Sequence, residues 1–230
     1  MQPLLILLFL LTVLPPFALV TFFYFQDRRE PEPRGHVAGA FALGLLAVAP
    51  ALLLAQLAER LLPGLARSAA GDAFVLAGAI EEATKLAVLL ASVYGWAEFD
   101  EPIDGIVYAV ALSLGFATTE NALYVLRGGV GVVALRAIFT VPGHGLLGVV
   151  IGYHIGRAKF SGRRTHAALL VAAGFLLAAF LHGLFDFILL VSGGWRALLL
   201  LGILLAALWT VAFRWMRSAQ IRSPFPSAGR

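Results

Sequence analysis

The sequence predicts an all-α, polytopic integral membrane protein, built as a bundle of about seven transmembrane helices. Hydrophobic residues make up 60% of the 230 residues and charged residues only 13%, with a mean hydropathy of +0.91, whereas ordinary soluble domains are about 45–50% apolar. The apolar runs match or exceed the roughly 20 residues that cross a bilayer. They are continuous and rich in Leu, Ala and Gly, and therefore lack the alternation of barrel strands, so helices are the expected spanning structure.

Seven such runs are separated by short connections, which leave no room for a soluble domain. The chain is therefore expected to form one transmembrane domain, 1–230, with a functional core at about 71–191. The predicted spans are Pro3 to Phe25, Val37 to Leu62, Asp72 to Trp96, Gly105 to Leu126, Gly131 to Gly156, His166 to Val191 and Trp195 to Trp215.

Local features justify these spans in order. The first run has neither a basic n-region nor an A-x-A cleavage site, so we expect it to be retained as a helix. The charged, proline-rich stretch QDRREPEPRG separates it from the second run. The third and fourth runs are apolar but carry carboxylates. The fifth contains Gly145, Gly148, Gly152 and Gly156, a spacing typical of close helix packing. Histidine and aspartate interrupt the sixth run, and basic residues follow the seventh.

The distribution of basic residues predicts the orientation, because cytoplasmic loops carry an excess of Lys and Arg. One side has the larger set, namely Arg28, Arg29, Arg34, Arg157, Lys159, Arg163, Arg164, Arg214, Arg217, Arg222 and Arg230. The other side has Arg60, Arg67, Arg127, Arg136 and Arg196. We therefore predict a multi-pass protein of the cell membrane with its N-terminus outside and its C-terminus inside. The sequence pI near 9.8 follows from these loops, so the lipid bilayer and not nucleic acid is the expected partner.

Charged residues inside the third span are the first functional signal. The stretch AGAIEEATKLAVLL contains Glu81, Glu82 and Lys85, although a charge at the bilayer centre costs a few kcal/mol. Lys85 is three and four residues from the two glutamates, so it can neutralise either of them. The remaining carboxylate is a candidate general base, but the spacing does not say which one it is.

Polar residues of three later spans add to this set. His182 and Asp186 are four residues apart, so the aspartate can hold the imidazole in one orientation. FATTEN contributes Glu120 and Asn121, and VPGHG contributes His144. A rise of about 1.5 Å per residue places these groups in the outer half of the membrane. A purely structural role remains open, since buried ion pairs and interhelical hydrogen bonds also occur in bundles.

Four short stretches resemble the motifs of a known family. EEATK, FATTE followed by Asn121, PGHGLLG and HGLFD are similar to the four motifs of the PrsW family of intramembrane proteases, relatives of the CAAX prenyl proteases and the Abi proteins. The resemblance covers roughly Gly71 to Val191. It departs in the third motif, where the family form has phenylalanine four residues before the histidine and this chain has Thr140, with Phe139 one position earlier. That departure leaves open whether the helix that carries His144 has the same register as in the family.

The resemblance implies an intramembrane endopeptidase that uses glutamate and histidine to activate water. It implies a cut on the extracytoplasmic side of a membrane-anchored protein such as an anti-sigma factor. The candidate catalytic residues, from the resemblance and the spacing together, are Glu81, Glu82, Lys85, Glu120, Asn121, His144, His182 and Asp186.

Two alternatives stay open at this point. A protease that activates water through glutamate and histidine alone needs no cofactor. Carboxylates and imidazoles are, however, also zinc ligands. A zinc protease would take Glu82, Glu120, His144 and His182 as ligands. Buried Glu, Lys and His also mark proton pathways, so a proton-coupled transporter, or a scaffold for other membrane proteins, is the other alternative.

Overall fold

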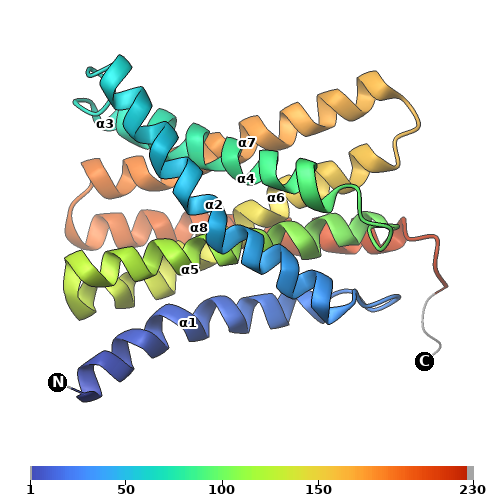
Figure 1. Ribbon diagram of the computed structural model, residues 1–230, viewed down its shortest axis with the longest axis horizontal. Helices are drawn as coiled ribbons and strands as arrows, with labels where there is room; N and C mark the ends of the chain where they lie inside the picture. The colour runs from blue at the N-terminus through green and yellow to red at the C-terminus, as the bar shows by residue number, and fades with distance from the viewer. Residues whose placement is uncertain (1, 227–230) are drawn as a thin grey trace.

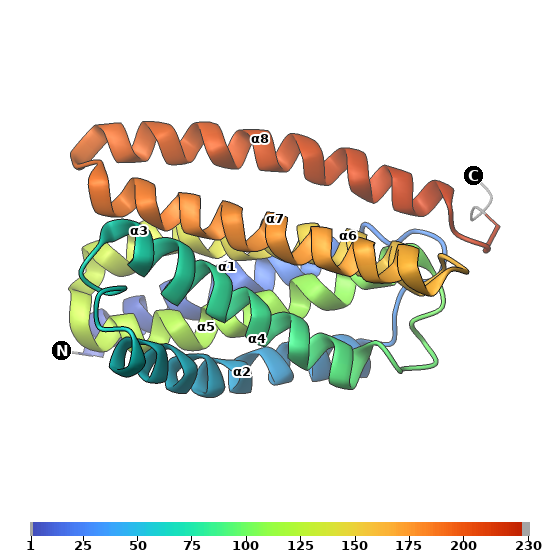
Figure 2. The same ribbon diagram turned by 90° about the horizontal axis from the view of Figure 1, so that it is seen from above.

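The protein is a bundle of long helices in a computed structural model that describes residues 2–226 (Figures 1 and 2). The elements in chain order are α1 (Gln2–Tyr24), α2 (Arg34–Leu61), α3 (Ala69–Gly71), η1 (Asp72–Ala79), α4 (Ile80–Val88), η2 (Leu89–Val93), α5 (Pro102–Leu135), η3 (Arg136–Thr140), α6 (Val141–Lys159), α7 (Arg164–Val191) and α8 (Gly194–Ile221). The segments labelled η are π-helical. No strand occurs within 2–226, and the predicted all-α membrane bundle is confirmed.

Six helical stretches are long and apolar enough to cross a membrane. They are Leu7–Tyr24, Arg34–Leu61, Pro102–Val125, Val130–Lys159, Arg164–Val191 and Gly194–Ile221. The predicted third span is helical too, but it consists of α3, η1, α4 and η2 and carries the charged residues, so it falls outside this apolar set. The orientation of the termini remains a prediction.

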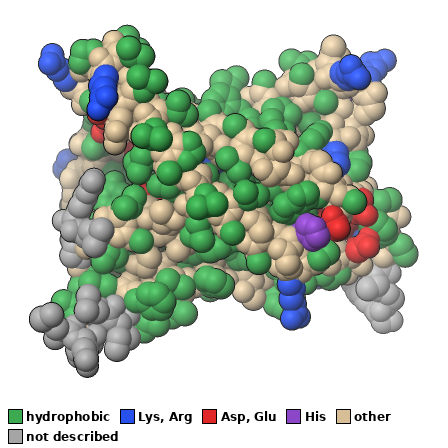
Figure 3. Space-filling view, viewed as in Figure 1, with side chains coloured by type: hydrophobic (Ala, Val, Ile, Leu, Met, Phe, Trp, Pro, Cys, Tyr) green, Lys and Arg blue, Asp and Glu red, His purple; other side chains and the backbone are tan. Residues whose placement is uncertain are grey.

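α5 is the central helix of the bundle. Of its most apolar stretch 89% is buried inside the protein, compared with 22% for α1. α6 runs antiparallel beside it, and α7 lies between α8 and α4 (Figure 2). Hydrophobic side chains are spread over the face seen in Figure 3, and Lys and Arg side chains lie mainly toward the two ends. This distribution is that of a protein solvated by lipid.

Glycines allow the central helices to touch through their backbones. A Cβ built on Gly152 of α6 would stand 2.3 Å from the carbonyl oxygen of Gly105 in α5, and one on Gly156 would stand 2.3 Å from that of Pro102. The predicted close packing of this stripe therefore holds for Gly152 and Gly156, and Gly148 is similarly close to Val110. On its other face α5 approaches α2, where a Cβ on Gly44 would meet the Leu112 carbonyl oxygen at 1.9 Å.

We predict that Gly152→Ala lowers the melting temperature in detergent, because the α5 backbone cannot yield as a flexible side chain would and overpacking costs about 1–3 kcal/mol. Gly202→Ala in α8 is the matched control, since a Cβ there meets nothing within 4 Å. It should be neutral or stabilising, because alanine favours a helix by up to about 1 kcal/mol. Equal melting temperatures for the two variants would contradict the close approach.

Candidate active site

Lys85 lies at the centre of a buried polar cluster in the bundle. It is 2% exposed, and its Nζ donates to Glu82 Oε1 at 2.7 Å and to His144 Nδ1 at 3.1 Å. Glu81 Oε2 is farther away, at 3.6 Å from Nζ. The Phe116 ring closes another side, with its centre 4.2 Å from the ammonium nitrogen. Lys85 therefore neutralises Glu82 most directly, a choice that the i,i+3 and i,i+4 spacings left open.

His182 is oriented by Glu82. Its Nδ1 donates to Glu82 Oε1 at 2.8 Å, whereas Asp186 Oδ2 is 3.7 Å from Nε2, beyond hydrogen-bonding distance. Asp186 is thus in ion-pair range of the ring, as the spacing allowed, but the hydrogen bond that orients the ring comes from Glu82 of α4. The two carboxylates face different ring nitrogens. His182 Nε2 is left to face Asp186 and Glu81, whose Oε2 is 3.9 Å away.

Glu120 joins the cluster through His144. The Nε2 of His144 donates to Glu120 Oε2 at 3.0 Å, while its Nδ1 accepts from Lys85. A continuous chain of hydrogen bonds thus runs from His182 through Glu82, Lys85 and His144 to Glu120. The two imidazole rings are nearly perpendicular, with centres 5.2 Å apart. Side chains from α4, α5, α6 and α7 are brought together by this chain.

Arg136 is a site residue that the sequence analysis missed. Its Nη2 lies 2.8 Å from Glu120 Oε2, and its Nε donates to Asn121 Oδ1 at 2.7 Å. Asn121 is fully buried, so it positions the guanidinium from a site that water does not reach. The signal was present, since Arg136 falls inside the predicted span Gly131 to Gly156, where a charge needs a partner. In the sequence, Arg136 contributes only to the prediction of which side of the membrane each loop faces.

Glu81 is the carboxylate left without a close partner. Its Oε2 is buried and has no hydrogen-bond partner, although the side chain as a whole is 19% exposed. Glu82, by comparison, is fully buried and is bound by both Lys85 and His182. Of the two adjacent glutamates, only Glu81 lines the cavities beside the site.

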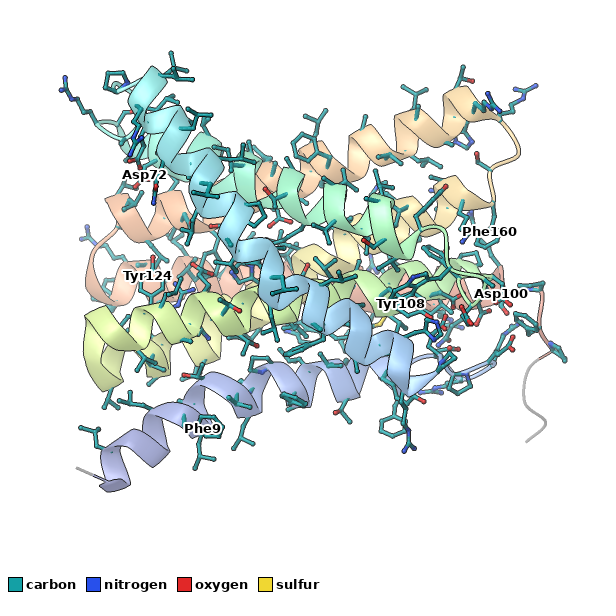
Figure 4. All side chains as sticks on the ribbon, viewed as in Figure 1. Phe9, Asp72, Asp100, Tyr108, Tyr124 and Phe160 are labelled. Atoms are coloured by element: carbon teal, nitrogen blue, oxygen red, sulfur yellow. The ribbon has the colours of Figure 1, made fainter. Side chains whose placement is uncertain are left out.

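A cleft of about 660 Å³ leads to these groups. Its walls come from α2, η1, α4, α5, η3, α6, α7 and α8. Its polar lining includes Glu81, Glu120, Arg136, His144 and His182. Asp72 and Tyr124 also line it, and they lie at the end of the bundle opposite Asp100 and Tyr108 (Figure 4). The cleft thus joins the polar cluster to the end that the basic residues predict to be extracytoplasmic.

The π-helical turn η3 gives a physical reason for the irregular third motif. η3 ends at Thr140, immediately before the α6 segment that carries His144. A π turn accommodates one more residue than an α turn, so it offsets the expected phenylalanine by one position. Phe139 still packs against the hydrophobic core, and Thr140 lines the cleft.

Comparisons with known proteins identify the family. The profile of a family described as "PrsW family intramembrane metalloprotease" matches residues 32–216. The chain is 39% identical over 208 residues to Protease PrsW of Geobacillus kaustophilus, covering 90% of each chain. It is 36% identical over 183 residues to Protease PrsW of Bacillus subtilis, covering 80% of this chain and 83% of the relative. The chain belongs to the PrsW family. No solved structure matches it.

Membership of the PrsW family makes the chain a multi-pass membrane protein and an intramembrane protease. Its substrates are therefore proteins met in the membrane environment. The family assignment also favours the protease over the transporter or scaffold. The polar cluster beside the cleft brings carboxylates and imidazoles together, which makes it the candidate site for such a reaction.

The family description, a metalloprotease, implies a bound metal ion. One ligand atom each from Glu81, His144 and His182 lies within 4.8 Å of the others. Three such ligands and a water make up many catalytic zinc sites, so the donor set fits in kind and number. This set differs from the expected one, because Glu82 and Glu120 are engaged by Lys85, His182, Arg136 and His144.

We predict that Glu120→Gln and Arg136→Gln each lower the melting temperature, because each leaves a largely buried partner without its counter-charge. Breaking buried pairs costs about 3–5 kcal/mol, and a smaller loss is expected here since both side chains keep some exposure. The double variant should recover much of the stability. Melting curves of all four proteins in detergent give the coupling energy, and additive losses would show that the pair is not coupled.

Proposed function

We propose that this PrsW-family protease hydrolyses a peptide bond of a membrane-anchored protein with Glu81 as the general base. The observation that carries the proposal is the contrast between the two adjacent glutamates. Glu82 is fully buried and bound by Lys85 and His182, whereas Glu81 lines the cleft and its side chain is 19% exposed. A base must reach the water whose proton it takes, and access therefore favours Glu81.

The reaction follows from this arrangement. Glu81 removes a proton from a water in the cleft, and the water oxygen attacks the scissile carbonyl carbon. His182, held through Nδ1 by Glu82, presents Nε2 toward the same space and donates a hydrogen bond to the oxyanion. Glu81 then gives its proton to the leaving amine as the C–N bond breaks. The products are a carboxylic acid and an amine, and transfer of the acid's proton to the amine leaves a carboxylate and an ammonium group.

The other residues of the set position these two groups. Lys85 lies 3.6 Å from Glu81 and favours its ionised form. Both ring nitrogens of His144 are engaged, by Lys85 and Glu120, so His144 acts as a positioning residue. Arg136 and Asn121 fix Glu120 in turn. Asp186 is 28% exposed and lines the cleft beyond His182, where it can contact the substrate.

The proposed substrate is a protein with a single span, of which an anti-sigma factor is one example. A segment of it would unwind into the cleft between α2 and α5 on one side and α7 and α8 on the other. The predicted orientation makes the cut extracytoplasmic. An extended substrate is required, because the backbone of an intact helix is hydrogen-bonded and wound away from the catalytic groups.

We predict that Glu81→Gln lowers hydrolysis by about 100-fold or more, the usual loss for a general base, with little change in melting temperature. Glu82→Gln should instead lower the melting temperature, because it leaves Lys85 and His182 without a buried counter-charge. The measurements are cleavage of a single-span substrate in proteoliposomes and melting in detergent. The matched control is Glu30→Gln, an exposed carboxylate in the α1–α2 loop. Normal cleavage by Glu81→Gln would reject Glu81 as the base.

A zinc-dependent form of the same reaction is the second candidate, favoured by the proximity of Glu81, His144 and His182 ligand atoms. A bound zinc ion polarises the carbonyl and activates a water. His144 would have to release its bond to Lys85 or Glu120 to offer a lone pair.

We expect activity to survive complete metal removal if Glu81 acts alone. The measurement is cleavage by protein stripped with a chelator, with its metal content determined in parallel. Activity that disappears on stripping and returns with zinc, but not with magnesium, would favour the zinc form. Melting curves of the stripped and the untreated protein control for effects of the chelator treatment on folding.

A further inference from the structure

A second group of buried carboxylates lies at the other end of α5 from Glu120. Asp27 in the α1–α2 loop meets Glu101 and Asp104 at the start of α5, and one carboxylate oxygen of each lies within 4.8 Å of the others. Their exposures are 3%, 1% and 1%. Figure 4 labels Asp100 and Tyr108 at this end, and Figure 3 shows acidic side chains gathered there. The catalytic proposal does not use this cluster.

Within the part of the chain that the structure describes, most oxygens of this cluster have no hydrogen-bond partner. Asp104 Oδ2 accepts the backbone N–H groups of Asp100 and Glu101, at 2.9 and 2.7 Å, and Asp27 Oδ1 accepts that of Arg29 at 3.3 Å. The buried oxygens without a partner are Asp27 Oδ2, Asp104 Oδ1 and both oxygens of Glu101. Glu101 forms the capping box of α5 with Asp104, yet within residues 2–226 neither of its oxygens makes a hydrogen bond of standard geometry. It is a fully buried carboxylate close to two others. Unpaired buried carboxylates are costly, and each calls for an explanation.

The neighbouring basic side chains do not neutralise the cluster. Within residues 2–226, no ion pair includes Asp27, Glu101 or Asp104. Lys159 Nζ donates to the carbonyl oxygens of Tyr94 and Trp96, and Arg29 donates to that of Phe225. The charges must therefore be removed by protons or balanced by an added cation.

We propose that Asp27, Glu101 and Asp104 bind a hard divalent cation, Mg²⁺ or Ca²⁺. The donors are all carboxylate oxygens, the ligands that these ions prefer, and the cluster offers neither sulfur nor imidazole to a softer metal. Four oxygens are free to coordinate without breaking a hydrogen bond. Glu32 lies behind the cluster as a further acidic neighbour, where it accepts the Tyr108 hydroxyl.

A cation there would join three separate parts of the chain. Asp27 belongs to the α1–α2 loop, Glu101 to the connection before α5, and Asp104 to the first turn of α5. The C-terminal segment is attached to the same loop, since Arg29 donates to Phe225 O and Gln220 donates to Gln26 O. The site is therefore structural, and it would hold the loops at the predicted cytoplasmic end of α5.

The test is metal binding to the full-length protein in detergent after a chelator has been added and removed. Mn²⁺ serves as the probe, because its free ion has an electron paramagnetic resonance signal that disappears on binding. We expect one saturable site per chain that Mg²⁺ or Ca²⁺ empties by competition, and the metal should raise the melting temperature by a few degrees through mass action. Glu101→Gln and Asp104→Asn should each weaken binding tenfold or more.

Two matched variants identify the site. Asp100→Asn removes the same charge from an exposed neighbour and should leave binding unchanged. Glu81→Gln should also leave it unchanged, which separates this site from any metal at the intramembrane cluster. The proposal is overturned if the wild type binds no Mn²⁺, or if its melting temperature responds to pH but to no divalent cation. Binding that survives in both Glu101→Gln and Asp104→Asn overturns it equally. If one of the two variants fails to fold, the other and the wild-type stoichiometry still decide.

Discussion

The buried ion pair between Lys85 and Glu82 is the interaction on which the rest of the site depends. Both side chains are almost completely removed from solvent. Desolvation costs several kcal/mol for each ion, and further hydrogen bonds are needed to offset it. Here His182 and His144 supply those bonds, and Phe116 adds a cation–π contact. Lys85 and Arg136 balance two of the three glutamates of the cluster, and a protonated His182 would lie between the remaining carboxylates, Glu81 and Asp186. The same contacts that offset the buried charges also hold the side chains in place.

That arrangement requires a close approach of backbones, which explains why glycines flank the polar residues. A Cβ on Gly78, just before the glutamates, would lie 2.5 Å from the Ala179 carbonyl oxygen of α7. A Cβ on Gly183, next to His182, would lie 2.3 Å from the Phe74 ring. The two helices therefore pack within reach of a 2.8 Å bond between His182 and Glu82. Larger residues at these positions would separate the helices and leave both side chains buried without partners.

Much of this could be predicted from the sequence, because apolar runs and charge spacing act locally. The helices and the polar residues were identified, apart from Arg136. The sequence did not predict which side chains of the site hydrogen-bond to one another. The spacing of His182 and Asp186 allowed a contact, but Glu82 from another helix lies closer, and only the packing of α4 against α7 determines that. The choice between Glu81 and Glu82 was open for the same reason, since adjacent residues differ by about 100° around a helix and the neighbours of each depend on the bundle. Asp27 and Glu101 lie in connections between the predicted spans, and no pattern in the sequence singled them out, although folding buries both.

The two carboxylate clusters at opposite ends of α5 balance their charge in different ways. Around Glu120 the protein supplies its own cations, Arg136 and Lys85, which are fixed in sequence and cannot exchange with solvent. Around Asp104 the basic side chains are bound to backbone carbonyl oxygens instead. A fixed cation suits a catalytic site, where the charge beside the base must be present at every turnover. An exchangeable cation suits a junction of loops, because it can bind after the separate segments have folded into place. α5 links these two environments as the most buried helix of the bundle, so the position of Glu120 depends on how firmly the other end of the helix is held.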